Sequence, residues 1–266
     1  MVDTGTDTDN IAELPDGWKI IFQPSAPSSN DLAHACLEEK GRLAHGQCFV
    51  VGEQTRGRGR LGRDWVSRSG DGLYFSAVLC PQTERANWSS LSFAVSLAVL
   101  DCLREILGKY ADRLSLKWPN DILLDHAGEK RKIAGILLEA STQGVIAGCG
   151  INLRNAPVSD TQKHKAVALD SLLAEQTPTP YKLAPFLASY LAQNYQLWLN
   201  EGRHLVIERW QSQCKMKNER LSVQLADQTI KGICAGFGKE GELHLRTADN
   251  QLVKISAGDV EIMKGK

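Results

Sequence analysis

The chain has 266 residues, enough for one large domain with a small appendage or for two domains of ordinary size. Its 31 Lys and Arg residues balance 31 Asp and Glu residues, so no overall field would draw it to nucleic acid or to an anionic membrane, and any phosphate site must be local. No apolar stretch is long enough for a membrane span, and the N-terminus lacks the features of a secretory signal, so we expect a cytoplasmic protein. The seven cysteines lack the short spacing of a zinc site or a redox pair, which predicts free thiols.

The first segments are a polar leader, a helix and two strands. Residues 1–16 are polar and lack periodicity, which is typical of a mobile leader. Polar capping residues followed by an amphipathic run predict a helix over 28–39, with Gly41 as its stop. Apolar, β-prone runs predict strands at 47–51 and 73–79, with a loop rich in glycine and arginine between them.

A layered α/β domain is predicted from the segments that follow. Residues 88–107 carry apolar side chains at helical spacing, with small residues that would allow close packing on a sheet. Further strands are expected at 114–118, 122–124, 132–140 and 145–151. Two amphipathic helices, 181–201 and 203–214, are separated by Gly202. We therefore expect an α/β (α+β) domain over 17–214, with packed helices on a largely antiparallel sheet.

The last part of the chain has a different residue pattern. Short alternating strands separated by turn residues are predicted at 221–225, 229–237, 242–246, 252–256 and 260–263. This pattern indicates a small five-stranded barrel, and we expect it to form a separate domain over 215–266.

The loop between the first two predicted strands is suited to binding phosphate. Residues 56–63 contain three glycines and four arginines. Glycine lets the backbone approach a ligand and present its N–H groups, and arginine offers a charged fork of donors to phosphate oxygens. The loop is not a Walker motif, because no Gly-Lys-Ser/Thr ending is present. An arginine-rich nucleic-acid tract is the alternative that these residues alone leave open.

Three further segments place polar groups or glycines at strand ends. Within 117–121, a proline fixes a turn, and Asp121 is a candidate Mg²⁺ ligand because that ion prefers carboxylate, phosphate and water oxygens. Lys132 introduces an apolar strand, where its ammonium could stabilise charge developing on a carboxylate and a phosphate. The glycines of 148–153 suggest either a close backbone approach to a ligand or a β-bulge. A turn with solvated charges and a solvated strand end are the alternative readings of the first two segments.

Taken in order, five of these segments resemble the motif series of the biotin protein ligases: 28–30, 57–63, 117–121, 132–139 and 150–152. The resemblance spans about 25–263, since the C-terminal strands look like that family's SH3-like domain. It implies a class II synthetase-like sheet and a two-step reaction. Biotin attacks the α-phosphate of Mg-ATP to give biotinyl-5'-AMP, and a lysine of a biotin carboxyl carrier protein then attacks this mixed anhydride. ATP and Mg²⁺ are thus expected with biotin as substrate, and no structural metal.

The resemblance also implies residue roles. The catalytic residues would be Lys132, Arg60 and Arg58, with Arg60 helping to close the loop over the adenylate. The residues implied for the biotin pocket are Ser28, Ser29, Asn30, Gln54, Gly57, Arg58, Arg60, Lys132 and Gly135. Those implied for ATP are Arg58, Arg60, Arg63, Trp65, Asn120, Asp121, Lys132 and Asn152, with Trp65 beside the adenine and Asp121 toward Mg²⁺.

Two departures from the family pattern and two rival functions remain. Ser29 stands where the family usually has threonine, and 168–172 matches its motif only loosely. The stretch before Ser28 is too short for the winged helix of the repressor members, so we expect no DNA binding. The rivals are a lipoate or octanoate ligase of the same superfamily and an arginine-glycine nucleic-acid module. We expect a monomer or weak homodimer.

Overall fold

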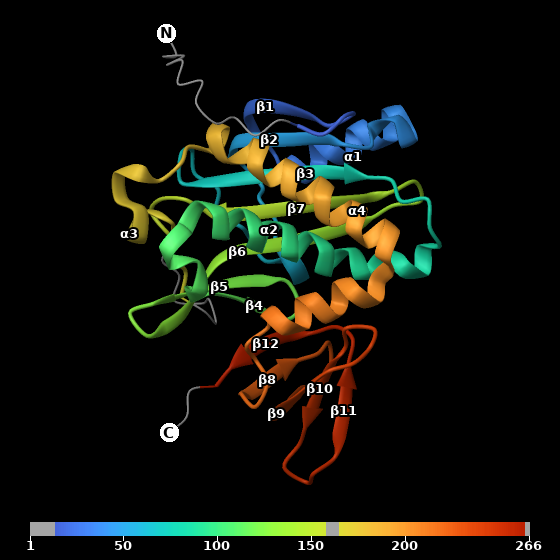
Figure 1. The fold of residues 1–266 in the computed structure, drawn as a ribbon, viewed down its shortest axis with the longest axis vertical. Helices are drawn as coiled ribbons and strands as arrows, with labels where there is room; N and C mark the ends of the chain where they lie inside the picture. Colours follow the sequence, from blue (N-terminus) through green and yellow to red (C-terminus); the bar gives the residue numbers. More distant parts are fainter. Residues whose placement is uncertain (1–13, 158–164, 264–266) are drawn as a thin grey trace.

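The computed structural model describes residues 14–157 and 165–263, and within them the chain forms two sheets (Figure 1). The larger sheet has seven strands in the order β1-β2-β3-β7-β6-β5-β4. Their bounds are β1 Lys19–Ala26, β2 Gln47–Gln54, β3 Gly72–Leu79, β4 Leu114–Lys117, β5 Asp121–His126, β6 Glu129–Ala140 and β7 Val145–Asn152. β1 and β2 pair in parallel and the other neighbours pair antiparallel, which confirms the predicted largely antiparallel sheet.

Helices cover both faces of this sheet. α2 (Leu91–Leu107) and α4 (Pro180–Gln213) lie on one face and α1 (Ser29–Lys40) on the other, while α3 (Asp170–Leu173) is a single turn (Figure 1). The two predicted C-terminal helices form one element, α4. It is interrupted at Gly202, whose φ of 81° is not helical. The predicted break is therefore present, without a loop between the two parts.

The ends of α1 confirm the predicted caps. The Ser28 side chain accepts a hydrogen bond from the backbone N–H of Asn30, and Gly41, with a φ of 56°, ends the helix by donating its N–H to Leu37. These caps fix where the N-terminus of α1 lies on the sheet. The strand before it, β1, was not predicted: it is an exposed edge strand containing Pro24, so it lacks a buried alternating pattern.

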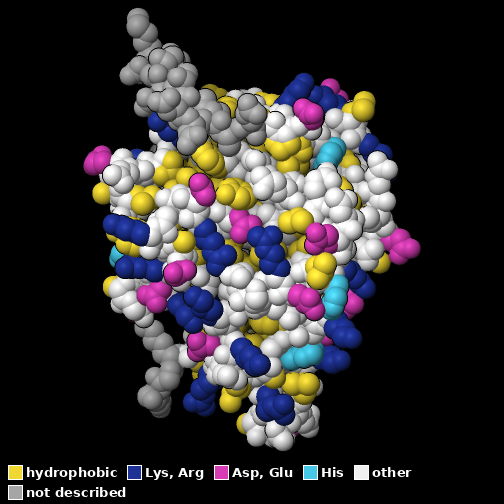
Figure 2. Space-filling model, viewed as in Figure 1, with side chains coloured by type: hydrophobic (Ala, Val, Ile, Leu, Met, Phe, Trp, Pro, Cys, Tyr) yellow, Lys and Arg dark blue, Asp and Glu magenta, His cyan; other side chains and the backbone are white. Residues whose placement is uncertain are grey.

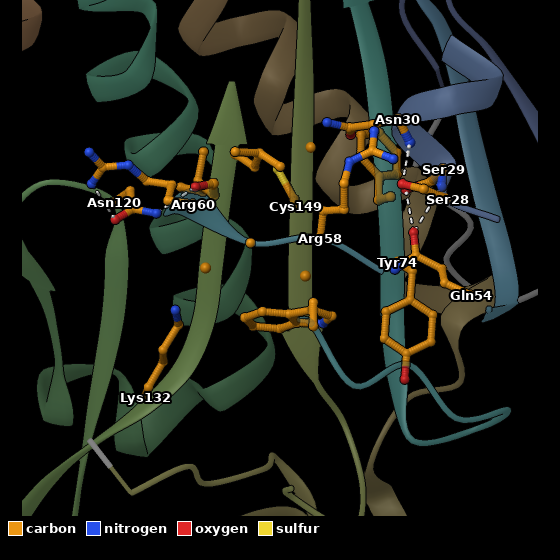
Figure 3. A pocket seen from close by; sticks show the side chains of 18 residues that line it. Ser28, Ser29, Asn30, Gln54, Arg58, Arg60, Tyr74, Asn120, Lys132 and Cys149 are labelled. Atoms are coloured by element: carbon orange, nitrogen blue, oxygen red, sulfur yellow. Dashed lines mark hydrogen bonds between the residues drawn. The ribbon is translucent and has the colours of Figure 1, made fainter. Parts of the chain in front are cut away.

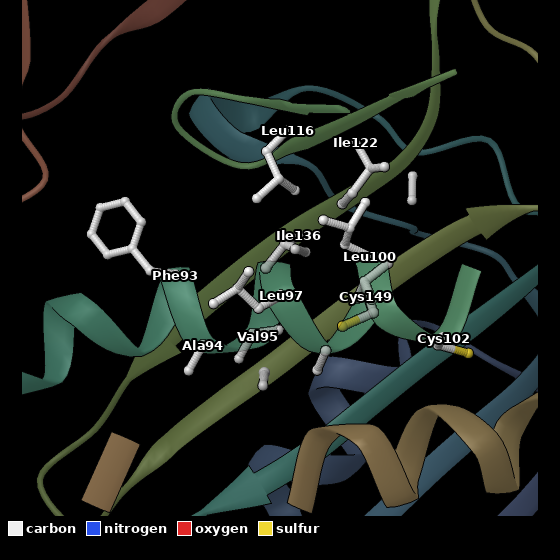
Figure 4. Close-up of a cluster of buried hydrophobic side chains, with 14 of the residues drawn as sticks. Phe93, Ala94, Val95, Leu97, Leu100, Cys102, Leu116, Ile122, Ile136 and Cys149 are labelled. Carbon is white, nitrogen blue, oxygen red and sulfur yellow. The ribbon is translucent and has the colours of Figure 1, made fainter. Parts of the chain in front are cut away.

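The main core lies between α2, α4 and the sheet. Figure 4 shows Leu97 and Leu100 of α2 facing Leu116, Ile122 and Ile136 of the strands. A smaller cluster under α1 covers the opposite face of the sheet. All seven cysteines are buried and free, as predicted, and burial raises the pKa of the Cys149 thiol to about 12.

The smaller sheet has five antiparallel strands in the order β11-β10-β9-β8-β12. They are β8 Arg220–Gln224, β9 Thr229–Phe237, β10 Leu243–Arg246, β11 Leu252–Ile255 and β12 Asp259–Ile262, close to the predicted positions. The sheet packs under β4 and the end of α4, where Trp118 Nε1 donates to the Gly241 carbonyl at 3.0 Å (Figure 1). The division into domains at residue 214 stays a prediction. Residues 1–13 of the predicted leader lie outside the described residues.

The surface over α2 and α4 carries both signs of charge. Figure 2 shows Lys and Arg side chains interspersed with Asp and Glu on this face. Within the described residues, none of the helices has the length and apolar character that a bilayer crossing requires.

The core assignment predicts the effect of one truncation. Leu100 is fully buried, and Leu100→Ala should lower the free energy of unfolding by about 2–5 kcal/mol through lost burial and a residual cavity. Leu43→Ala is the control, because Leu43 is 87% exposed; its effect should stay within about 0.5 kcal/mol. Urea unfolding followed by circular dichroism measures both, and equal effects would contradict the assigned core.

Candidate active site

Two adjoining cavities lie on the α1 side of the large sheet. The smaller has a volume of about 50 Å³ and the larger about 540 Å³. The side chains and backbone common to both are Gly59, Arg60, Trp65, Asn120 and Lys132. Of the residues expected for biotin, the smaller cavity is lined by Ser28, Ser29, Asn30, Gln54, Arg58, Arg60, Lys132 and Gly135. Of those expected for ATP, the larger is lined by Arg60, Arg63, Trp65, Asn120, Asp121, Lys132 and Asn152.

Paired glycines form the floor of the smaller cavity. Gly135 of β6 lies opposite Gly150 of β7, and Tyr74 of β3 continues the row. A methyl group added at Gly150 would come within 2.5 Å of the Trp65 ring, and one at Gly135 within 2.9 Å of Lys132 Nζ. The absence of these side chains leaves a slot on the sheet surface.

The indole of Trp65 occupies this slot at the boundary of the two cavities. Lys132 Nζ lies 5.1 Å from the centre of its ring, within range of a cation–π contact. The indole Nε1 of Trp65 is buried and has no hydrogen-bond partner among the residues that the structure describes. With Trp65 in this position the smaller cavity is well below the size of an ordinary ligand pocket, so a ligand that enters it must displace the indole.

Polar groups from α1, β2 and β3 line the back of the smaller cavity. Gln54 Oε1 accepts from Ser29 N at 2.8 Å, and its Nε2 donates to Ser67 Oγ at 2.7 Å. Ser76 Oγ lies 2.7 Å from Ser29 Oγ and 2.6 Å from Asn30 Oδ1. Figure 3 shows Ser29, Asn30 and Gln54 on one side of the pocket and Lys132 on the other.

A β-bulge turns Lys132 toward the cavities. Asp121 pairs with Gly135 and Leu123 with Lys132, so β6 has one more residue than β5 over this stretch. In a regular strand Lys132 and Gly135 would face opposite sides of the sheet, and the extra residue places both on the cavity side while Ile133 enters the core. The local register therefore positions the ammonium group.

Asp121 lies between two ammonium groups. Its Oδ1 is 2.6 Å from Lys132 Nζ, and its Oδ2 is 3.0 Å from Lys117 Nζ. Burial alone would raise the pKa of Asp121, but the two lysines outweigh it and hold that pKa well below its usual range. Burial lowers the pKa of Lys117, whose side chain is only 2% exposed, and Asp121 opposes this effect.

These contacts do not form a site for a magnesium ion. Both oxygens of Asp121 are already held by ammonium groups. Within 14–157 and 165–263, no cluster of three or more His, Cys, Asp or Glu side chains could hold a metal. A cation at Asp121 would also lie beside two lysines, and like charges repel at this distance. The described residues therefore favour Asp121 as a partner of lysine.

The loop of residues 55–71 between β2 and β3, here called the arginine loop, contacts three other parts of the molecule. Arg58 donates to Asp31 of α1 at 2.7 Å, Arg60 donates to Asn120 Oδ1 at 3.2 Å, and Arg63 forms an ion pair with Asp259 of β12. The hydrogen bond that Arg58 donates to Asp31 raises the pKa of Arg58, whereas burial lowers the pKa of Arg60. Both stay charged at neutral pH. The loop thus presents positive charge to the cavities and connects them to the small sheet.

Comparison with known proteins identifies the family. The model described as "Biotin/lipoate A/B protein ligase family" matches residues 28–154. The biotin--[acetyl-CoA-carboxylase] ligase of Paracoccus denitrificans is 34% identical over 210 residues, which cover 76% of this chain and 85% of that protein. The chain belongs to the biotin protein ligase family.

Two further family members match over almost the whole chain. The biotin--[acetyl-CoA-carboxylase] ligase of Mycobacterium tuberculosis is 28% identical over 257 residues, 95% of this chain and 92% of that protein. The solved biotin protein ligase from Aquifex aeolicus in complex with biotin and ATP has a TM-score of 0.76 and 25% identity. That match covers 93% of this chain and 99% of the other, which confirms the predicted fold.

Within this biotin protein ligase fold, three predicted site residues need a separate description. Arg58, expected for both biotin and ATP, lines the smaller cavity and not the larger. Gly57 lines neither cavity, and a methyl group there would come within 2.3 Å of the Trp65 carbonyl, so its role in the structure is close backbone packing. Asn152 lines the larger cavity, but its amide donates to the carbonyls of Lys132 and Val167 and holds β6 beside the segment that follows β7.

Several residues near the cavities were missed by sequence reasoning: Ser67, Tyr74, Ser76, Lys117, Glu139 and Asp259. Alternating polar positions in the strand 73–79 were a signal for Tyr74 and Ser76, since they mark one face. Lys117 ends a buried strand within the motif 117–121, and that position was a second signal in the sequence. Asp259 gave no local signal, because its partner Arg63 is 196 residues away.

The Asp121 environment predicts how stability depends on pH. Because the folded pKa lies below the unfolded value of about 3.9, the stabilisation is present above that value and is lost as the pH falls below it. Asp121→Asn should reduce the free energy of unfolding at pH 7 by about 3–5 kcal/mol, since it leaves buried lysine unpaired. The variant should also lose less stability than the wild type between pH 6 and pH 3.

Urea unfolding at several pH values measures both effects. Asp227→Asn is the control, because Asp227 is exposed in the turn between β8 and β9. A wild-type and an Asp121→Asn protein with the same acid dependence would contradict the assigned ion pairs.

Proposed function

We propose that the chain is an ATP-dependent biotin–protein ligase. It activates biotin as biotinyl-5'-AMP with release of pyrophosphate, and then transfers the biotinyl group to a lysine with release of AMP. The observation that carries this proposal is the position of Lys132 where the two cavities meet. One cation there can contact both the carboxylate of an acid in the smaller cavity and the α-phosphate of a nucleotide in the larger.

In the first step, a biotin carboxylate oxygen attacks the α-phosphorus, and the bond to the pyrophosphate oxygen breaks. Two anionic groups must approach each other, so the site has to offset their repulsion. Lys132 and Arg60 line both cavities and would stabilise charge on the transferring phosphoryl group. Arg63 would reach the phosphates on leaving Asp259. Asp121 acts as a positioning residue, because it holds Lys132 through an ion pair, and Lys117 holds the other oxygen of Asp121.

In the second step, the amine of the acceptor lysine attacks the carbonyl of the mixed anhydride, and AMP leaves. No covalent enzyme intermediate is required. The intermediate hydrolyses in water, so a loop that covers it is an advantage. The arginine loop lines both cavities and carries Trp65 between them, so its movement would both admit the substrates and enclose the adenylate.

The same proposal includes the partners of the enzyme. The acceptor is the biotin carrier domain of a carboxylase, and the reaction takes place in the cytoplasm with the enzyme as a monomer or weak homodimer. Magnesium would arrive with ATP, held by phosphate and water oxygens. We assign no step to the metal, because the described residues do not form a site for it.

The first experiment is ATP–pyrophosphate exchange with the purified protein, with biotin, lipoate and octanoate in parallel. We expect exchange with biotin. Lys132→Ala should lower kcat/KM for exchange by about 100- to 1,000-fold, the range found on removal of a preorganised donor. Lys130→Ala is the matched control: Lys130 lies on the same strand but is exposed and paired with Glu219.

The other outcomes distinguish the rival functions. Exchange with lipoate or octanoate in place of biotin would assign the chain to the lipoate branch, which the family model also includes. No exchange with any acid, together with a salt-dependent affinity for RNA or DNA, would favour the nucleic-acid module. Equal loss in Lys130→Ala and Lys132→Ala would contradict the role of Lys132.

A further inference from the structure

Glu139 lies beside the smaller cavity without lining it, and several hydrogen-bond donors surround its carboxylate. Its Oε2 accepts from Asn30 Nδ2 at 2.7 Å and from His34 Nε2 at 3.2 Å, and it lies 3.7 Å from the Arg58 guanidinium. A carboxylate accepts hydrogen bonds and cannot donate them. Asn30 must therefore present its NH₂ group to Glu139, and the facing nitrogen of His34 must carry a hydrogen.

This contact fixes the direction of a hydrogen-bond chain along the cavity wall. With its NH₂ group on Glu139, Asn30 presents its carbonyl oxygen to Ser76 Oγ at 2.6 Å. An amide oxygen only accepts, so Ser76 gives its single hydrogen to Asn30. Ser29 Oγ lies 2.7 Å from Ser76 Oγ and 3.2 Å from Gln54 Oε1, and it must give its own hydrogen to one of them.

The chain ends at the cavity in an oxygen that accepts. Because the hydrogen of Ser76 is already used, none of the described residues fills the lone pairs of Ser29 Oγ. Ser29 lines the smaller cavity. Gln54 is fixed as well, since its oxygen accepts from Ser29 N and its nitrogen donates to Ser67. This wall therefore offers an acceptor to a ligand that carries N–H groups.

We propose that Glu139 is a positioning residue that determines specificity, by setting the direction of this chain so that Ser29 accepts from a ring N–H of the acid substrate. The proposal rests on the proposed function, because the cyclic urea of biotin carries such N–H groups. Lipoate and octanoate carry none. A buried acceptor left without a donor is unfavourable, so the wall would disfavour those acids.

Glu139→Gln tests the direction of the chain with little change in shape. A glutamine can donate to the Asn30 oxygen, which lets the Asn30 amide turn and donate to Ser76. Ser76 is then free to donate to Ser29, and a lone pair of Ser29 is filled. The KM for biotin in pyrophosphate exchange should rise about tenfold, the size of one lost hydrogen bond, while KM for ATP and kcat stay within about twofold.

Direct binding of biotin without ATP, measured by calorimetry, should weaken by the same factor in Glu139→Gln. An unchanged biotin affinity, or an equal rise in KM for ATP, would overturn the proposal. If Glu139→Gln does not fold, Ser29→Ala removes the acceptor itself and should weaken biotin binding by a similar factor; an unchanged biotin affinity in that variant would also overturn the proposal. Ser76→Ala has no hydroxyl with which to fill the Ser29 lone pair, so its biotin affinity should stay close to that of the wild type.

Asp31→Asn is the matched control. It removes the shorter of the two ion pairs of Arg58, the one with Asp31 at 2.7 Å, and leaves the contact between Glu139 and Asn30 in place. Its KM for biotin should stay well below that of Glu139→Gln, and an equal rise would show that the effect passes through Arg58. A wild-type protein inactive with biotin would refute the proposed function, whereas an active wild type with an unaffected Glu139→Gln refutes only the role of Glu139.

Discussion

The ion pairs of Asp121 with two lysines are the interaction on which the rest of the site depends. A buried ammonium is costly unless a carboxylate neutralises it, and Asp121 supplies that charge to Lys117 at the edge of the sheet. The same carboxylate holds Lys132, which a bulge in β6 has turned toward the cavities. The register of β4, β5 and β6 thus sets where positive charge meets the substrates.

The arginine loop and the small sheet complete this arrangement. Trp65 rests on the slot above Gly150 and divides the space into the cavities that we assign to the acid and to the nucleotide. Arg63 joins the loop to Asp259 at the start of β12, so the small sheet contributes directly to the larger cavity. A ligand that draws Arg63 to its phosphates would break this link. Movement of the loop would then be coupled to the contact between the sheets.

Local sequence signals predicted the elements that local interactions determine. The caps of α1, the break at Gly202 and the strands of the small sheet follow from turn residues and from periodicity. The motif series located most of the cavity lining, because its segments, from α1, the arginine loop and the strands β5 to β7, meet on the same side of the sheet.

Features that depend on distant partners could not be predicted. β1 is held by pairing with β2 and has no pattern of its own. The bulge that orients Lys132 exists only because the register of the pairing between β5 and β6 shifts by one residue. Glu139 is the last residue but one of β6, and its importance appears only when Asn30, 109 residues earlier, is brought beside it.

A double-mutant cycle on Asp121 and Lys132 tests the central claim most directly. Wild type, Asp121→Asn, Lys132→Ala and the double variant are compared by kcat/KM for biotin-dependent pyrophosphate exchange. If Asp121 acts by holding Lys132, the double variant is no slower than Lys132→Ala, because the lysine that Asp121 positions is already gone. If the two losses instead multiply in the double variant, Asp121 acts independently on the nucleotide or its metal ion. That result would contradict the claim that Asp121 acts by holding Lys132.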